Sequence, residues 1–98
     1  MSLPLVILHD AEADIAEAKQ WYEHKRQGLG DEFVLCLEEA LDRICQFPES
    51  ARVVLKSVRR IGVRRFPYGV FYRIESKRIE VMAVYHSHRD PRGWKERA

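Results

Sequence analysis

Residues 67–86, PYGVFYRIESKRIEVMAVYH, decide the fold of this chain. Apolar and polar side chains alternate on both sides of Glu75-Ser76-Lys77, a turn-forming triplet, and this pattern predicts two antiparallel strands. One face of the pair would then carry Val70, Tyr72, Ile74, Ile79, Val81, Ala83 and Tyr85. The opposite face would carry Phe71, Arg73, Met82, Val84 and His86, an amphipathic set that we expect something to cover.

The residues before this hairpin predict two more strands and two helices. Leu5 to Leu8 is a short branched apolar run typical of a buried strand, and Ile61 and Val63 alternate with polar residues. Asp10 can cap a helix whose apolar stripe is Ala11, Ile15, Ala18 and Tyr22. Gly28 and Gly30 break that helix. A second helix is predicted from about Asp31 to Phe47, where Pro48 stops it, with an inner face of Phe33, Leu37, Ala40, Leu41 and Ile44.

The order β-α-α-β-β-β predicts an α+β fold, with an N-terminal helical hairpin packed on one face of a mostly antiparallel, twisted sheet. We expect residues 1–98 to form a single domain. The residues expected in its core are Tyr22, Phe33, Leu37, Ile44, Val70, Tyr72, Val81 and Ala83.

Composition limits the cellular setting. No run approaches the roughly 20 apolar residues that a membrane span requires, and Leu3 to Leu8 has no basic flank and leads directly to Asp10, unlike a signal peptide. We therefore expect a cytoplasmic protein with no membrane partner. Cys36 and Cys45 lie nine residues apart on one predicted helix, roughly 13 Å, too far for a disulfide, so both should be reduced thiols.

Charge is distributed unevenly. Residues 1–50 hold four basic and eleven acidic side chains, a balance of −7, whereas residues 51–98 hold thirteen basic and four acidic ones, a balance of +9. Such asymmetry indicates either a basic face with an anionic partner or two halves that neutralise each other in the fold. In the second case the arginines would pair with Glu38, Glu39 and Asp42 on the second helix.

Few residues fit enzymatic chemistry. The chain has no glycine-rich phosphate loop, no GxSxG and no HExxH. His86 and His88 could begin a zinc site, but a third ligand at suitable spacing is missing, so we predict neither metal nor cofactor. Arginines could cleave RNA without a metal if Tyr85, His86 or His88 supplied a positioned acid or base. If the protein is a ribonuclease, the candidate catalytic set is Arg64, His88 and Arg89.

Several motifs together resemble the ParE branch of the ParE/RelE superfamily, the toxin halves of bacterial toxin–antitoxin operons. The resemblance spans residues 5 to 97, and its most specific segment is Arg65-Phe66-Pro67-Tyr68-Gly69-Val70-Phe71-Tyr72-Arg73. The other motifs are Ala11-x-x-Asp14-Ile15, Trp21-Tyr22-Glu23, Gly28-Leu29-Gly30-Asp31-Glu32-Phe33, Ala40-Leu41-Asp42-Arg43-Ile44 with Pro48, and Ala83-Val84-Tyr85-His86-Ser87-His88-Arg89-Asp90-Pro91-x-x-Trp94.

The resemblance implies a function that depends on the branch. ParE-like toxins are described as poisons of DNA gyrase with no catalysis of their own, whereas RelE-like toxins cut mRNA on the ribosome. This chain departs from the RelE pattern, because Gly69 and Ser87 occupy positions where RelE has arginine and no Tyr follows Trp94. The resemblance therefore favours a gyrase inhibitor. The alternatives are a metal-independent endoribonuclease and a non-toxic binding module of the same fold.

The resemblance also implies partners. We expect a hetero-oligomer with a cognate antitoxin, a small protein encoded upstream whose C-terminal segment is acidic and binds the sheet face or the groove beside the helical hairpin. The residues assigned to antitoxin binding are Arg59, Arg60, Arg64, Arg65, Phe71, Arg73 and Val84. Those assigned to the target are His86, His88, Arg89 and Trp94, the last of which we also expect to fold back onto the domain.

Overall fold

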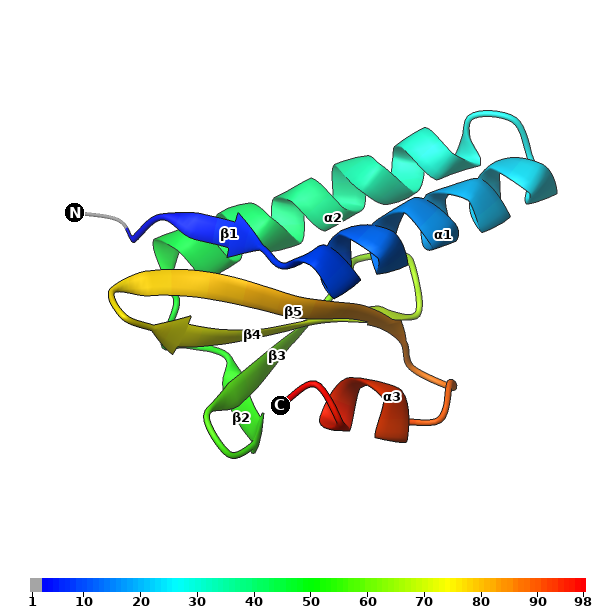
Figure 1. The fold of residues 1–98 in the computed structure, drawn as a ribbon. Helices are drawn as coiled ribbons and strands as arrows, with labels where there is room; N and C mark the ends of the chain where they lie inside the picture. Colours follow the sequence, from blue (N-terminus) through cyan, green and yellow to red (C-terminus); the bar gives the residue numbers. More distant parts are fainter. Residues whose placement is uncertain (1–2) are drawn as a thin grey trace.

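The computed structural model describes residues 3–98, which form a sheet with helices on both faces (Figure 1). The elements are β1 (Leu5–Ile7), α1 (His9–Lys25), α2 (Leu29–Gln46), β2 (Arg52–Leu55), β3 (Val58–Gly62), β4 (Tyr68–Glu75), β5 (Arg78–His86) and α3 (Arg92–Lys95). Helices α1 and α2 form an antiparallel hairpin on one face, which we call the inner face, and α3 lies on the opposite, outer face.

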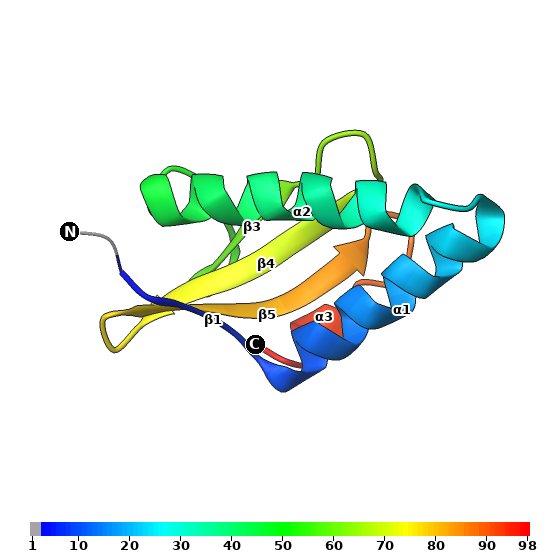
Figure 2. The same ribbon diagram turned by 90° about the horizontal axis from the view of Figure 1, so that it is seen from above.

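The five strands follow the order β1-β5-β4-β3-β2. β1 runs parallel to β5 at one edge, and every other neighbouring pair is antiparallel. Seen from above, α2 crosses β3 and β4 while α1 lies beside β5 (Figure 2). The expected α+β fold with a mostly antiparallel sheet is confirmed.

Two elements were not predicted. β2 has four residues, two of them exposed, at the edge of the sheet, so it lacks the apolar alternation that identifies a longer strand. It pairs with β3 through a tight turn in which Lys56 has φ of 51°. The second missed element, α3, also has four residues and lies where only a tail was expected.

The helix boundaries differ from the predicted ones for physical reasons. α1 begins at His9 without a side-chain cap, so the prediction that Asp10 caps it is wrong; the Leu8 carbonyl already accepts from the Glu12 N–H at 3.0 Å. Gly28, with φ of +88°, ends the link, and α2 begins at Leu29. Glu23 of α1 accepts hydrogen bonds from the Gly28 and Gly30 N–H groups at 2.9 and 3.0 Å, which lowers the pKa of its carboxyl.

Gly30 therefore belongs to α2, and it does not lie in the break between the two helices as predicted. A Cβ at this position would lie 2.6 Å from the Lys19 carbonyl oxygen of α1, so a glycine is needed for the two helices to pack together here.

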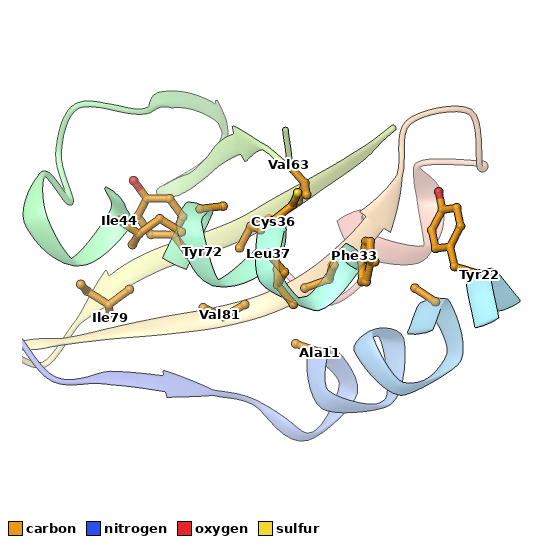
Figure 3. Close-up of a cluster of buried hydrophobic side chains, with 14 residues drawn as sticks. Ala11, Tyr22, Phe33, Cys36, Leu37, Ile44, Val63, Tyr72, Ile79 and Val81 are labelled. Carbon is orange, nitrogen blue, oxygen red and sulfur yellow. The ribbon is translucent and has the colours of Figure 1, made fainter. Parts of the chain in front are cut away.

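The inner core confirms the predicted burial (Figure 3). All eight predicted core residues are buried; seven belong to this inner cluster, while Ala83 belongs to the cluster on the outer face. Phe33 and Tyr72 are fully enclosed. Tyr22 and Phe33 stack with ring centroids 5.4 Å apart, joining α1 to α2. Leu41, expected on the same helix face, is only partly buried. Both cysteines are free thiols, as predicted.

A β-bulge in β5 corrects the predicted alternation. Tyr72 is opposite Val81 and Phe71 is opposite Ala83, so Met82 is the extra residue on β5. From this point the side chains exchange faces: Val84 packs in the inner core, while Ala83 and Tyr85 join Phe71 on the outer face. The prediction that Val84 shares a face with Phe71 is therefore wrong, because the bulge shifts the period by one residue.

The bulge is held by two side chains distant in sequence. The Val84 N–H donates to Asp14 Oδ2 at 3.0 Å, and Arg97 Nη1 donates to the Met82 carbonyl at 3.1 Å. Arg97 and Asp14 also form an ion pair at 2.6 Å, which raises the pKa of Arg97. The C-terminus is thereby tied to both α1 and β5.

Candidate functional site

The outer face is covered in part by α3, as its apolar composition predicted. The Trp94 ring stacks on Phe71 at 4.2 Å, leaving Trp94 only 7% exposed and Phe71 5%. Gly93 lies against Tyr85, where a Cβ would come within 3.0 Å of the Tyr85 Cζ. The Tyr85 hydroxyl donates to the Asp90 carbonyl at 2.9 Å. Trp94 therefore folds back onto the domain as expected.

Most arginines assigned to the antitoxin already have partners within the chain. Arg59 donates to the Glu49 and Ala51 carbonyls, both at 2.8 Å. Arg64 and Arg65 pair with Glu39 and Glu32 of α2 at 2.6 and 3.1 Å. Arg73 pairs with Glu80 at 3.0 Å. The fold thus neutralises part of the basic half internally, through two of the carboxylates on α2.

Arg60 is different. Among residues 3–98, none of the carboxylates forms an ion pair with it, and its one hydrogen bond is a 3.3 Å contact from Nη2 to the Ser87 hydroxyl. Its side chain lies on Gly69, where a Cβ would be 2.7 Å from the Arg60 Cζ, and its Cζ is 5.8 Å from the Phe71 ring centroid. Gly69 and Ser87, where the chain departs from the RelE pattern, both contact Arg60.

Arg60 is part of a groove of about 440 Å³ on the outer face, here called the arginine groove. Arg52 stands directly opposite Arg60 on the neighbouring strand. None of the residues lining the groove is acidic. Its polar rim is formed by Arg52, Arg60, Ser87, Arg89 and Lys95, beside Trp94.

A second groove, of about 380 Å³, lies on the inner side between α1 and the ends of β4 and β5, and we call it the α1 groove. Its main walls are Glu17, Trp21, Tyr68, Val84, His86 and Arg89. Trp21 is 54% exposed, and Lys25 lies over its ring at 4.6 Å from the centroid. Burial raises the pKa of the Tyr68 hydroxyl. An exposed indole beside a hollow is a typical anchor point for a partner chain.

The four residues assigned to the target are divided between the two faces. His86, His88 and Arg89 line the α1 groove, where the His86 Nδ1 accepts from the His88 N–H at 3.0 Å. Trp94 lies on the outer face beneath α3 and contributes little exposed surface. The α1 groove thus brings His86, His88 and Arg89 together, and two of them, His86 and Arg89, also line the arginine groove with Trp94.

The candidate ribonuclease set is not assembled either. Arg64 donates to both Glu39 oxygens from the loop between β3 and β4, while His88 and Arg89 lie in the α1 groove, which Arg64 does not line. Within residues 3–98, no cluster of three or more His, Cys, Asp or Glu side chains could hold a metal ion.

Sequence reasoning missed three surface residues. Arg52 lies on β2, which was not predicted, so its position opposite Arg60 could not be inferred. Lys95 belongs to α3, the helix expected only as a tail. Trp21 falls next to the predicted stripe residue Tyr22, and that position could have identified it as an aromatic on the exposed side of α1.

The helical hairpin packed on a mostly antiparallel sheet is a fold that this chain shares with a solved structure. The chain is similar in structure to a chain of the chromosomal ParDE toxin–antitoxin system from Pseudomonas aeruginosa, with a TM-score of 0.67. The match covers 86% of this chain and 95% of that one at 14% sequence identity, so it shows the fold alone.

The family of the chain is shown by a match to a protein-family model. Residues 5–91 match the ParE toxin of the type II toxin–antitoxin system parDE, and the chain belongs to this family. A comparison with curated protein sequences finds no match. None of the helices in residues 3–98 is long and apolar enough to cross a membrane.

Proposed function

We propose that this ParE-family toxin inhibits DNA gyrase without catalysing a reaction of its own, and that a cognate antitoxin neutralises it by direct binding. The match over residues 5–91 supports the gyrase target, because the ParE branch is described as acting there. The observation that favours inhibition over RNA cleavage is the dispersal of Arg64, His88 and Arg89.

General acid–base catalysis requires groups that reach the same reacting atoms. Arg64 is held by Glu39 on α2, and its bidentate geometry satisfies the guanidinium that would otherwise stabilise a phosphorane. His88 and Arg89 lie in a different part of the molecule. A ribonuclease built from these three residues would need a rearrangement of the loop between β3 and β4.

For the antitoxin we propose the α1 groove as the main docking site. An amphipathic segment could bury apolar side chains against Trp21 and Ala18 at its wall. Its carboxylates could meet Arg89 at one end and Lys25, which lies over Trp21, at the other. This proposal moves the anchor away from Phe71, which is 5% exposed on the outer face, while Val84, only 2% exposed, remains part of the groove wall.

The arginines assigned to the antitoxin differ in how freely they could bind its carboxylates. Arg59, Arg64, Arg65 and Arg73 would have to exchange existing partners for antitoxin carboxylates, so reversal at these positions tests fold stability together with binding. Arg60 is the one of the five with no carboxylate or carbonyl partner in the described chain, which makes it a cleaner probe of charge.

Target and mechanism are tested together by adding the purified protein to two reconstituted reactions. We expect loss of gyrase supercoiling or accumulation of cleaved DNA, and intact mRNA on translating ribosomes. In cells, expression without the antitoxin should arrest growth, and expression with it should not. Ribosome-dependent cuts in mRNA would establish the RelE-type activity instead, and normal growth at verified soluble expression would establish a non-toxic binding module.

The docking site is tested by titrating the antitoxin against Trp21→Ala. Removing an interface anchor of this kind raises the dissociation constant by about fivefold or more, since such positions contribute above about 1 kcal/mol. Leu35→Ala is the control, because Leu35 is 64% exposed on α2 and does not line the α1 groove. Equal affinities for the two variants would exclude the α1 groove as the main site.

A further inference from the structure

We propose that the arginine groove on the outer face binds the phosphate backbone of DNA. The inference builds on the proposed function, since a gyrase inhibitor acts on an enzyme that holds DNA, and it specifies a direct contact between toxin and DNA. It concerns the outer face of the sheet, whereas the proposed antitoxin site lies on the inner side, although His86 and Arg89 line both grooves.

The first argument is an electrostatic cost inside the fold. Arg52 and Arg60 are direct cross-strand neighbours, a position in which like charges repel and destabilise the sheet. Elsewhere the chain places carboxylates beside its arginines, as with Arg64, Arg73 and Arg97. In the arginine groove it places none, so the repulsion is relieved only when an anion arrives from outside.

The second argument is the preorganisation of Arg60. Gly62 and Gly69 are opposite each other on β3 and β4, and together they form a flat seat for the arginine side chain. A Cβ at Gly69 would be 2.8 Å from the Arg60 Nη2, so the seat depends on the missing side chain. The Ser87 hydroxyl and the Phe71 ring fix the guanidinium further. A guanidinium held in place loses less entropy when it binds phosphate.

The third argument concerns the kind of anion. Phe71, Tyr85 and Trp94 form the apolar floor, but they are 5%, 4% and 7% exposed beneath α3 and the charged rim. An amphipathic acidic peptide would find little apolar surface here, whereas the α1 groove offers Trp21. Bases would find no exposed aromatic ring on which to stack. A ligand held by charge alone, through its backbone, fits best, and duplex DNA is such a ligand.

The rim carries four cationic groups, from Arg52, Arg60, Arg89 and Lys95. If each neutralises one phosphate, the logarithm of the binding constant falls with the logarithm of salt at a slope of about −3.6. Between about 50 and 200 mM salt, the affinity should then fall about 150-fold. Binding should depend little on sequence, because backbone contacts carry no base information.

The test is fluorescence anisotropy of a short labelled duplex with the complete chain, free of antitoxin, over that salt range. The variant Arg52→Gln/Arg60→Gln should weaken binding and reduce the salt effect to about 12-fold, since two of four contacts remain. Lys19→Gln is the control, because Lys19 lies on α1, lines neither groove and makes only a 3.8 Å contact with Asp31. The double variant should melt at the same temperature as the parent or higher, because it removes a repulsive pair.

Other outcomes would overturn the inference or separate it from the proposed function. An unchanged salt slope in Arg52→Gln/Arg60→Gln would exclude the groove, and tighter binding of polyglutamate or of single-stranded RNA than of duplex would exclude DNA as its ligand. The double variant could lose DNA binding and still inhibit gyrase at full strength. In that case the arginine groove would have no role in gyrase inhibition. DNA binding without any effect on gyrase would retain the groove and refute the gyrase target.

Discussion

The inner face of the sheet lies under two helices of 17 and 18 residues, whereas the outer face lies under one helix of four. The inner core includes fourteen buried residues and the outer cluster six. On the inner face the exposed arginines of the adjoining loop are paired with α2 carboxylates. On the outer face Arg52 and Arg60 are opposed without a carboxylate.

The difference indicates a division of labour between stability and binding. The inner face contains most of the apolar burial that holds the fold together. The outer face is covered only by the short helix α3, and the charges of Arg52 and Arg60 repel each other there. A protein selected for stability alone would not retain such a repulsion. If this comparison is correct, substitutions at matched positions on the two faces should differ in size and in the kind of unfolding that they cause.

The largest effect is expected on the inner face. Leu37 is 2% exposed at the centre of α2, and Leu37→Ala should cost roughly 2–5 kcal/mol of unfolding free energy, as is usual for deleting a buried leucine side chain. Urea denaturation followed by circular dichroism measures it. Leu35→Ala, two residues away on the same helix and 64% exposed, should cost less than about 0.5 kcal/mol. Similar losses for both variants would mean that α2 presents a different face to the sheet.

A smaller effect is expected on the outer face. Trp94→Ala should cost about 1–3 kcal/mol, below the usual range for a buried aromatic, because the short terminal helix can detach while the inner core persists. Hydrogen exchange should show early opening of the amides of α3, with those of α2 still protected. Trp21→Ala, at the 54% exposed tryptophan, should cost less than about 1 kcal/mol and leave α3 protected.

Global unfolding of Trp94→Ala without prior exchange in α3 would contradict the comparison. It would show that the outer cluster is as integral to the fold as the inner one.

The contrast between the faces could be predicted only in part. The alternation in residues 67–86 and the stripes on the helices predicted the hairpin, the sheet and the eight core residues, because these depend on local periodicity. The Met82 bulge could not be predicted in this way. It depends on Asp14 and Arg97, which reach β5 from elements distant in sequence, and one extra residue reversed the faces of Val84 and Tyr85.

The candidate sites were harder to predict for a similar reason. Arg59 and Arg60 are adjacent in sequence and look equivalent there, but their side chains point to opposite faces of β3. Arg59 donates hydrogen bonds to two backbone carbonyls, whereas Arg60 has no anionic partner in the described chain. An arginine has an ion-pair partner only if the tertiary structure brings an acidic side chain close to it. Local sequence patterns contain no information on such contacts.

The smallest effect concerns paired charges at the other end of the outer face. Glu80 is 5% exposed and accepts hydrogen bonds from Arg73 Nε at 3.0 Å and Arg78 Nε at 2.8 Å, which lower the pKa of its carboxyl from the ordinary 4.5. A lowered pKa in the folded state means that the stabilisation is present above pH 4.5 and is lost as the pH falls through the folded value.

Glu80→Gln should therefore cost about 1 kcal/mol at neutral pH, since both arginines are partly exposed, and the difference from the parent should vanish in acid. Urea titrations between neutral pH and about pH 2.5 measure it, with Glu75→Gln, whose contact with Arg73 is 3.6 Å long, as the control that changes little at any pH. A constant difference across the whole range would show that Glu80 contributes by packing instead of charge. The contrast between the paired Arg73 and Arg78 and the opposed Arg52 and Arg60 would then lose its electrostatic basis.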